Sequence, residues 1–204
     1  MQTFRHPPEA QKALDKIIKE YLELGIIKPG YSEYCSPIYV IPKKQRDENG
    51  EKQFRAILDF RKINQIIIGD AFPMPNITEI LDKLSNCRYR SSLDAKMAFH
   101  QVKLTEDSQK YTAFAANNNL FVYLRSPMGL KSSNLVFCRL MQRILEILGP
   151  DWVFAYVDDL IMIAKSLEQR SIRLRQLLQR LKETKLLIDP KKCLFQKKDG
   201  NSNF

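Results

Sequence analysis

The chain has 204 residues, of which 44% are hydrophobic, and its 33 Lys and Arg exceed its 23 Asp and Glu to give a net charge of +10. This length supports one sizeable core or two subdomains, and no apolar run approaches the roughly 18 residues of a membrane-spanning helix. The N-terminal MQTFRHPPEA lacks the apolar segment of a signal peptide, and the four cysteines form no CxxC pair, which argues against a zinc site or a disulfide framework. We therefore expect an intracellular protein with no membrane partner.

The positive charge is concentrated near the C-terminus. Residues 165–198 contain eleven Lys or Arg and three Asp or Glu, a net charge of +8. Such a surface favours nucleic acid as a partner. The alternative is a helix whose basic face is simply solvated, and charge does not distinguish the two.

The first half of the chain is predicted to hold a helix, a hairpin and a second helix. Apolar residues recur at helical spacing over 8–24, and Gly25 is a C-terminal stop. Strands are expected at 36–44 and 54–60, and Asn49-Gly50 between them is a strong turn signal. After a proline-rich connector, Asn76 and Glu79 resemble a capping box that opens a short helix over 77–85.

The second half alternates hairpins with helices. The expected elements, in order, are a strand over 88–95, a hairpin over 111–126 with Asn117–Asn119 at its tip, a helix over 132–148 stopped by Gly149-Pro150, a strand–turn–strand over 153–164 and a basic helix over 167–185. The last helix carries an apolar stripe predicted to lie under a sheet, made of Leu167, Leu174, Leu177, Leu178 and Leu181. Helices interleaved with hairpin strands predict an α+β fold.

The sequence VFAYVDDLIMIA over 153–164 places two acids between apolar strands. At about 4 Å and an effective dielectric near 20, two carboxylates repel by roughly 4 kcal/mol. A third acid, Asp94, ends the strand RSSLD, so if the strands are neighbours, Asp94, Asp158 and Asp159 converge. Mg²⁺ prefers carboxylate and phosphate oxygens, and two such ions can serve phosphoryl transfer. An ordinary β-turn and a small Ca²⁺-binding module are the alternatives that the spacing leaves open.

Four segments then resemble the motifs of reverse transcriptases, in the order that the family has them. They are FRAILDFRKIN (54–64), LDAKMAFHQVKL (93–104), SPMGLKSSNLVFCRLMQRIL (126–145) and the Y-x-D-D box YVDD (156–159). The lead-in LELGIIKPGYSEYCSPIYVIPKK (22–44) is similar to that of gypsy-type LTR retrotransposons and related retroviruses. The resemblance spans about residues 8–196.

The resemblance implies a role for individual residues of the polymerase site. Asp94, Asp158 and Asp159 would be catalytic and would bind two Mg²⁺, or Mn²⁺ in their place, with the backbone carbonyl of Ala95 as a further ligand. The remaining residues fall into a nucleotide-binding set and a supporting pair. The nucleotide-binding set is Lys43, Lys44 and Arg55 for the triphosphate, Ala98 and Phe99 beneath the sugar, and Met128 and Gly129 at the base pocket, and the supporting pair is Tyr156 and Val157.

Two positions depart from the usual family pattern. Asn134 stands where relatives often have Pro, and Met128 replaces a common Phe or Gln. Neither removes a charged catalytic group, so they concern the shape of the pocket. After CLFQKK, relatives continue through an LGH segment into a thumb and a ribonuclease H domain, whereas this sequence passes into DGNSNF, so a thumb is not expected within it.

The implied fold is the fingers and palm of a right-hand polymerase, with a mainly antiparallel palm sheet packed on helices. The expected bounds are 1–71 and 104–131 for the fingers, 72–103 and 132–196 for the palm, and 197–204 for a tail. The implied activity is RNA-directed DNA polymerisation from dNTPs on a primed RNA or DNA template, as part of a retroelement polyprotein in a cytoplasmic particle with access to the nucleus. The alternative is a truncated or domesticated remnant that binds nucleic acid or a protein without polymerising.

Overall fold

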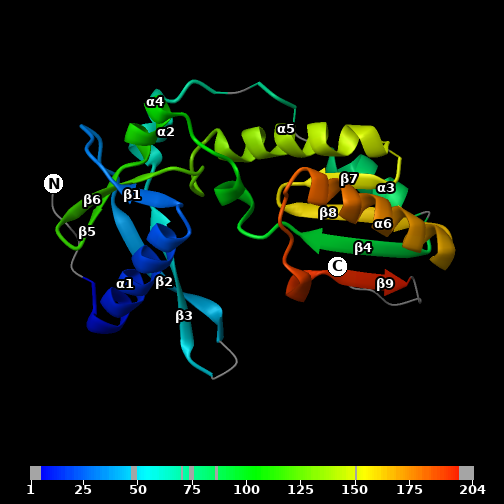
Figure 1. Cartoon of the computed structure of the whole chain (residues 1–204), viewed down its shortest axis with the longest axis horizontal. Coiled ribbons are helices and arrows are strands. Elements are labelled where there is room, and N and C mark those ends of the chain that lie inside the picture. Colours follow the sequence, from blue (N-terminus) through cyan, green and yellow to red (C-terminus); the bar gives the residue numbers. More distant parts are fainter. Residues whose placement is uncertain are drawn as a thin grey trace. The chain divides into compact units, whose positions relative to one another are not determined.

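The chain divides into two compact units, each made from two stretches of sequence. The computed structural model describes residues 6–46, 50–69, 71–73, 76–85, 87–149 and 151–197. The first unit comprises Met1–Gly69 and Val102–Ser133, and the second comprises Asp70–Gln101 and Asn134–Phe204. Both contain helices and antiparallel strand ladders (Figure 1). The predicted α+β class is therefore confirmed.

The first unit combines one long helix with two small sheets. Its strands are β1 (Ile27–Pro29), β6 (Asn119–Tyr123) and β5 (Phe114–Ala116), which form one sheet in that order, and the hairpin of β2 (Ile38–Arg46) with β3 (Lys52–Leu58). Its helical segments are α1 (Pro8–Glu23), α2 (Arg61–Ile66), α4 (Glu106–Gln109) and the single turn η2 (Lys110–Thr112). The predicted first helix and both hairpins are present.

Local signals explain where several of these elements begin and end. Pro8 occupies the first turn of α1, where the absent N–H costs nothing. Gly25 follows the helix with a φ of 62°, a conformation that glycine adopts without strain. The β5–β6 turn uses Asn117 and Asn118 at φ values of 52° and 58°, as predicted for its tip. Of the Asn49-Gly50 turn, Asn49 lies outside the described residues.

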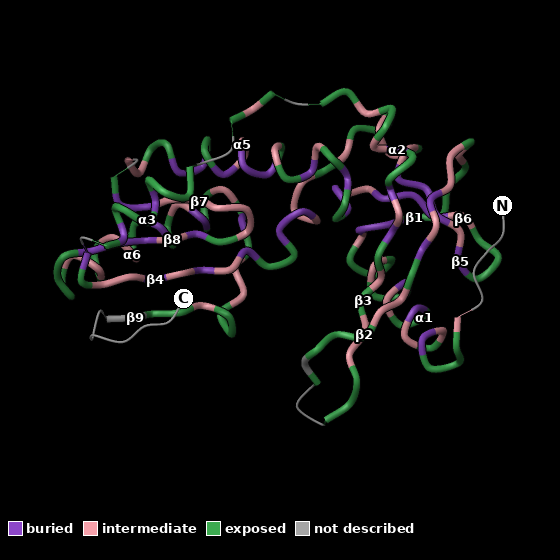
Figure 2. The backbone as a smooth tube through the Cα atoms, turned by 180° about the vertical axis from the view of Figure 1, so that it is seen from behind, coloured by how far each residue is buried: buried purple, intermediate pink, exposed green. Residues whose placement is uncertain are grey.

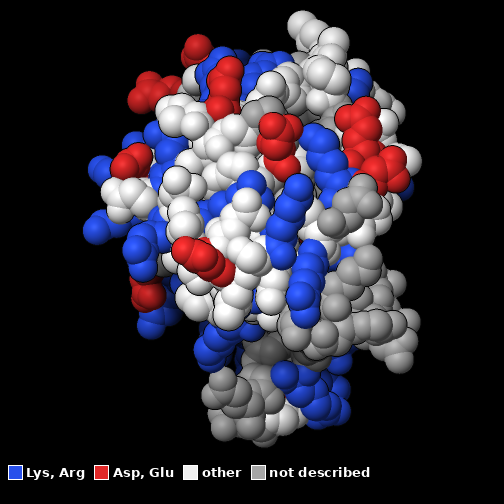
Figure 3. Space-filling view, turned by 90° about the vertical axis from the view of Figure 1, so that its right-hand side faces the viewer, with Lys and Arg blue, Asp and Glu red and all other residues white. Residues whose placement is uncertain are grey.

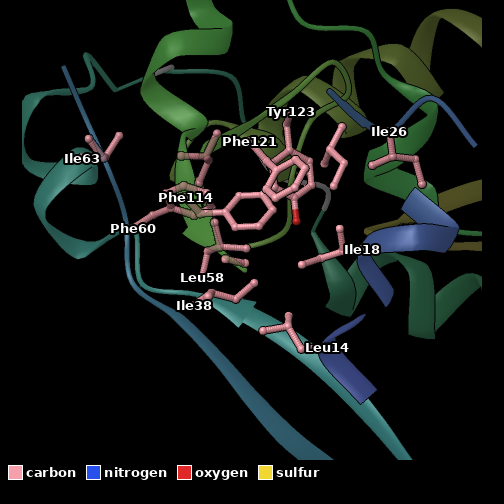
Figure 4. Packing of buried hydrophobic residues seen from close by; sticks show 13 residues of the cluster. Leu14, Ile18, Ile26, Ile38, Leu58, Phe60, Ile63, Phe114, Phe121 and Tyr123 are labelled. Carbon is pink, nitrogen blue, oxygen red and sulfur yellow. The ribbon is translucent and has the colours of Figure 1, made fainter. Parts of the chain in front are cut away.

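A single apolar cluster holds the first unit together. Leu14 and Ile18 of α1 contribute to it from one face of the helix, because residues four apart lie above one another. Figure 4 shows these side chains beside Ile38 and Leu58 of the β2–β3 hairpin and the rings of the β5–β6 sheet. The rings of Phe114 and Phe121 stack with centroids 5.6 Å apart. Aromatic and branched side chains from distant segments thus share one core.

The second unit is a four-stranded antiparallel sheet with helices. The strand order is β7 (Val153–Tyr156), β8 (Asp159–Ala164), β4 (Tyr89–Asp94) and β9 (Leu194–Lys197). Its helical segments are α3 (Ile77–Ser85), η1 (Ala98–Gln101), α5 (Ser133–Leu145), η3 (Glu146–Leu148), α6 (Leu167–Glu183) and η4 (Pro190–Lys192). Asn76 caps α3 by accepting a hydrogen bond from the Thr78 N–H. The strand β9 was not predicted.

The two faces of this sheet differ sharply in burial. Side chains alternate between faces along a strand, so Leu93 and Leu160 share one face while Asp94 and Asp159 share the other. Leu93 is 0% exposed and Leu160 is 1% exposed, whereas Asp94 is half-buried and Asp159 is exposed. Figure 2 shows buried residues along β8, whereas Leu194 and Phe195 of β9 are exposed. The sheet therefore presents its acids on its more accessible face.

Helix α6 packs against β8 with a narrower apolar stripe than the sequence predicted. Leu177 and Leu181 are buried, but Leu167 is 55% and Leu178 41% exposed. The prediction that these two leucines lie under the sheet was therefore wrong. At 3.6 residues per turn they lie about 80–100° around the helix from Leu177 and about 40–60° from Leu181. Within the described part of the chain, no helix is long and apolar enough to cross a membrane.

Candidate active site

Strand register places two of the three predicted acids, Asp94 and Asp159, opposite each other. Asp94, the last residue of β4, pairs with Asp159, the first residue of β8, and Asp159 also pairs with Tyr156 at the end of β7. Asp158 lies in the two-residue turn between β7 and β8. The condition set by the sequence, that the two strand ends be neighbours in one sheet, is therefore met.

The β7–β8 turn is held in a strained conformation. Val157 has a φ of 56°, which is rare for a β-branched residue and is usually found where the surroundings enforce it. Two contacts provide that enforcement. The Ala95 N–H donates to the Asp158 carbonyl at 2.9 Å, and the sulfur of the buried Cys138 of α5 accepts a hydrogen bond from the Val157 backbone N–H. The sequence did not single out Cys138, because nothing local links α5 to this turn.

The three acids repel one another electrostatically. Burial raises the pKa of Asp159, and the charges of Asp158 and Asp94 raise it further, while Lys192 lowers it. The Lys192 ammonium lies 3.1 Å and 3.3 Å from the two carboxylate oxygens of Asp94. Hydrogen bonding to Asp94 raises the pKa of Lys192. The site is thus an acidic cluster that attracts cations, with one lysine already beside it.

The donor set suits a hard divalent cation, although it is not a closed cage. Among the described residues, no group of three His, Cys, Asp or Glu side chains is arranged to hold a metal ion unaided. Mg²⁺ does not require such a cage, because it keeps several waters and takes one or two carboxylates together with substrate phosphates. Asp94 and Asp159, paired across two strands with Asp158 adjacent, supply oxygen donors of that kind.

The turn after β4 leads into η1, which carries Ala98 and Phe99. Both are buried, and the Phe99 ring meets the Phe137 ring of α5 edge-on, with centroids 5.8 Å apart. In this structure Phe99 therefore has the packing of a core aromatic, and its role beneath a sugar stays a prediction. Gln101 anchors the segment by donating to the carbonyls of Lys96 and Leu187 at 2.7 and 2.9 Å.

The other predicted nucleotide residues lie in the first unit. Arg55 is exposed on β3 opposite Ile41, and Lys43 and Lys44 lie in the irregular part of β2. Met128, at 66% exposure, and Gly129 lie in the loop before α5. The nucleotide set is thus divided between the two units, and a pocket containing all of it remains a prediction.

The Met128–Gly129 loop is held by a residue to which the sequence assigned no role. The Asn64 amide donates to the Gly129 carbonyl at 3.0 Å and accepts from the Lys131 N–H at 2.8 Å. Gly129 has a φ of 97°, which disfavours any residue with a side chain. Asn64 is the last residue of the segment FRAILDFRKIN. Its place in that motif was the one signal in the sequence that could have indicated its role.

Comparison with known proteins shows the family of this chain. Residues 41–201 match the family model described as reverse transcriptase (RNA-dependent DNA polymerase). The chain belongs to the reverse transcriptase family. It is 36% identical over 184 residues to the retrovirus-related Pol polyprotein from transposon 297 of Drosophila melanogaster, covering 90% of this chain and 17% of that protein. It is 32% identical to the corresponding polyprotein from transposon gypsy of the same organism, covering 88% of this chain and 17% of the relative.

Solved structures of reverse transcriptases share the fold. The chain superimposes on a foamy viral protease-reverse transcriptase in complex with double-stranded DNA with a TM-score of 0.85, at 24% identity, over 97% of this chain and 33% of that one. A second structure, of the foamy viral enzyme with an RNA/DNA hybrid, gives 0.83 at 23% identity, over 97% of this chain and 26% of that one. The chain spans less than a fifth of the Drosophila polyproteins and about a third of the first foamy viral chain. The predicted resemblance to gypsy-type reverse transcriptases is confirmed.

Proposed function

We propose that this chain forms the catalytic part of an RNA-directed DNA polymerase that extends a primer on an RNA or DNA template. The observation that carries the proposal is the pairing of Asp94 with Asp159 across β4 and β8, beside Asp158 in the strained turn. In a chain of the reverse transcriptase family, an acidic cluster on the accessible face of a sheet suits nucleotidyl transfer. The primer 3′-hydroxyl would attack the α-phosphate of a dNTP, and pyrophosphate would leave.

In the proposed reaction the chain contributes positioning and charge. Asp94, Asp158 and Asp159, with the Ala95 carbonyl, would hold two Mg²⁺, or Mn²⁺ in their place. Those ions, when bound, supply charge neutralisation at the reacting oxygens. The hydrogen bond from Ala95 to the Asp158 carbonyl fixes the turn relative to β4. Oxygen ligands that are already held in position lower the reorganisation required in the transition state.

The substrate contacts are proposed from motif positions. Arg55 and a lysine of the Lys43–Lys44 pair would bind the triphosphate, a task suited to a guanidinium fork and to an ammonium point charge. Phe99, next to Ala98, would exclude a 2′-hydroxyl. Met128 and Gly129 would shape the base pocket, and Tyr156 and Val157 would support the acids.

The molecular setting is also a proposal. Fingers at 1–71 and 104–131 and a palm at 72–103 and 132–196 would act together with the other parts of a retroelement polyprotein. The segment 197–204 would be a tail, although residues 198–204 lie outside the described part of the chain. Primer–template and dNTPs would be the partners, within an intracellular particle that reaches the nucleus.

A primer-extension assay with defined Mg²⁺ tests the function. Asp94→Asn and Asp158→Asn should each reduce extension about a thousandfold or more, because losing roughly 4 kcal/mol of transition-state stabilisation has that effect. Both variants should stay folded, since each keeps the side-chain shape. Asp151→Asn, at an aspartate whose side chain is 89% exposed, is the matched control and should extend normally.

Two outcomes would contradict the proposal. Substantial extension by both Asp94→Asn and Asp158→Asn would remove the assigned acids from the chemistry. Tight binding of primer–template without any Mg²⁺-dependent extension by the wild-type chain would favour the non-polymerising remnant instead.

A further inference from the structure

The carboxylate of Asp94 already has a cationic partner in this structure. The Lys192 ammonium lies 3.1 Å from one oxygen and 3.3 Å from the other, so it contacts both oxygens of the carboxylate that is proposed to bind a metal ion. The Asp94 side chain is 19% exposed, and that of Lys192 is 62% exposed. The lysine therefore reaches the acid from the solvent side.

The main chain, and not only the flexible lysine side chain, sets this contact. The Asp189 N–H donates to the Asp94 carbonyl at 2.9 Å, and Ala95 forms a bridge with Ile188. Asp189 then caps η4, accepting a hydrogen bond from the Lys191 N–H at its side chain and from the Lys192 N–H at its carbonyl. The end of β4 and the start of η4 are thus joined directly, which places the lysine beside Asp94.

The surrounding charges favour an ammonium group at this position. Asp94, Asp189 and Asp158 all act on Lys192, each stabilising its charged form. A single lysine thereby offsets part of the repulsion among the three acids while no other cation is bound.

We propose that Lys192 is the resident counter-ion of this acidic cluster, a positioning residue that holds Asp94 until a divalent cation displaces it. The inference rests on the proposed function, because it assumes that Asp94 is a metal ligand. An ion pair this exposed contributes little to stability, because solvent screens it. A doubly charged ion can therefore replace the ammonium at Asp94, and the lysine sets the cation concentration at which the site fills.

Binding of Mn²⁺ alone tests the competition without relying on activity. Free Mn²⁺ is measured by electron paramagnetic resonance during titration of the wild-type chain and of Lys192→Met, at fixed pH and ionic strength. Removing the competing ammonium should tighten Mn²⁺ binding about two- to fivefold. Lys191→Met is the matched control, because it removes an equal charge from the neighbouring residue, and it should shift the affinity clearly less.

A second measurement examines the pair when no metal is present. Thermal unfolding in EDTA should show a lower Tm for Lys192→Met than for the wild type, by about 1–4 °C. In an Asp94→Asn background the same substitution should have a smaller effect, since the partner charge is gone. This double-mutant comparison isolates the contact between the two residues.

The outcomes separate the two proposals. Equal Mn²⁺ affinities for wild type and Lys192→Met, with Mn²⁺ bound by both, would overturn the counter-ion while leaving the polymerase function intact. Equal shifts for Lys192→Met and Lys191→Met would show a general charge effect and would also overturn it. An absence of Mn²⁺ binding to either chain would contradict the metal-dependent function itself, and the competition with it.

Discussion

At the scale of single residues, the candidate site combines two locally unfavourable features. Val157 adopts a positive φ, and Asp158 and Asp159 place like charges side by side. The Cys138 thiol and the Ala95 N–H hold the turn from two sides. Strain of about 1–3 kcal/mol persists only where neighbouring structure enforces it, and here the enforced conformation keeps the acids at the ends of β4 and β8.

The proposed sugar contact of Phe99 gives the first prediction. Phe99→Ala should increase incorporation of ribonucleotides relative to deoxynucleotides, because a closely packed ring leaves no space for a 2′-hydroxyl. Single-nucleotide incorporation with each substrate measures the ratio. Phe137→Ala, which removes the ring that Phe99 contacts, controls for a general loss of packing. An unchanged ratio in Phe99→Ala would leave Phe99 as a core aromatic only.

The pH dependence of stability gives the second prediction. Burial lowers the pKa of His100 to about 4, below its ordinary value of 6.5. Between these values the unfolded chain binds a proton that the folded chain does not, so the free energy of unfolding should fall as pH drops from about 6.5 to 4. The loss is up to roughly 1.4 kcal/mol per pH unit, or about 3 kcal/mol in total.

Urea unfolding at several pH values measures this effect of His100. His100→Gln should flatten the dependence over that range, and His6→Gln, at the other histidine of the chain, is the matched control. A decline of the same size in His100→Gln would show that other groups cause it.

At the scale of elements, burial of α6 is uneven. Leu177 is 0% exposed and Leu181 is 2% exposed, whereas their neighbour Leu178 is 41% exposed. Two arginines of α6 also form hydrogen bonds to neighbouring elements. Arg173 donates to the Ile163 carbonyl at 2.8 Å, and Arg180 donates to the Ile144 carbonyl at 2.9 Å. The helix is thus attached to the sheet and to α5 by apolar side chains and by guanidinium groups.

The uneven burial predicts unequal costs of truncation along α6. Leu177→Ala should lower the free energy of unfolding by about 2–5 kcal/mol, because it leaves a cavity in a packed core. Leu178→Ala should cost less than about 1 kcal/mol, since a surface substitution removes few contacts. Urea denaturation of the two variants measures both, and similar costs would contradict the packing described for α6.

At the scale of the whole molecule, most of the excess positive charge belongs to residues 165–198, which carry +8 of the net +10. Figure 3 shows one face on which Lys and Arg side chains are more widespread than Asp and Glu. Part of the net charge of +8 over 165–198 supports the fold, through Arg173 and Arg180. The basic residues of α6 are therefore only partly available to a nucleic acid.

The charge predicts a steep salt dependence of nucleic-acid binding. The affinity for a primer–template should fall as salt rises, with one unit of slope in the log–log plot for roughly each phosphate contact. The exposed α6 residues Arg175 and Lys182, replaced together by Gln, should leave that slope unchanged, because α6 packs against β8 and supports the sheet. Fluorescence anisotropy at several salt concentrations measures it. If the magnitude of the log–log slope fell by about two units in this variant, α6 would be in contact with phosphates.

Several features of this protein follow from the sequence by itself. Helical spacing over 8–24, the Asn117–Asn118 turn and the two apolar runs that flank Asp158 and Asp159 each predicted an element that the structure contains. Such patterns are local, since a period of 3.6 or 2 residues and a turn preference involve only near neighbours. The motif order also placed the chain in its family.

The tertiary structure alone decided the pairing of β4 with β9, the contact of Lys192 with Asp94 and the exposure of Leu167 and Leu178. Each depends on segments far apart in the chain, and in the case of Lys192 and Asp94 the partners are 98 residues apart. Strand register and helix rotation set which of these side chains meet, and both are selected by the packing of a whole face. No local pattern carries that information, because the free energy that selects it arises only when the distant segments bury their apolar surfaces together.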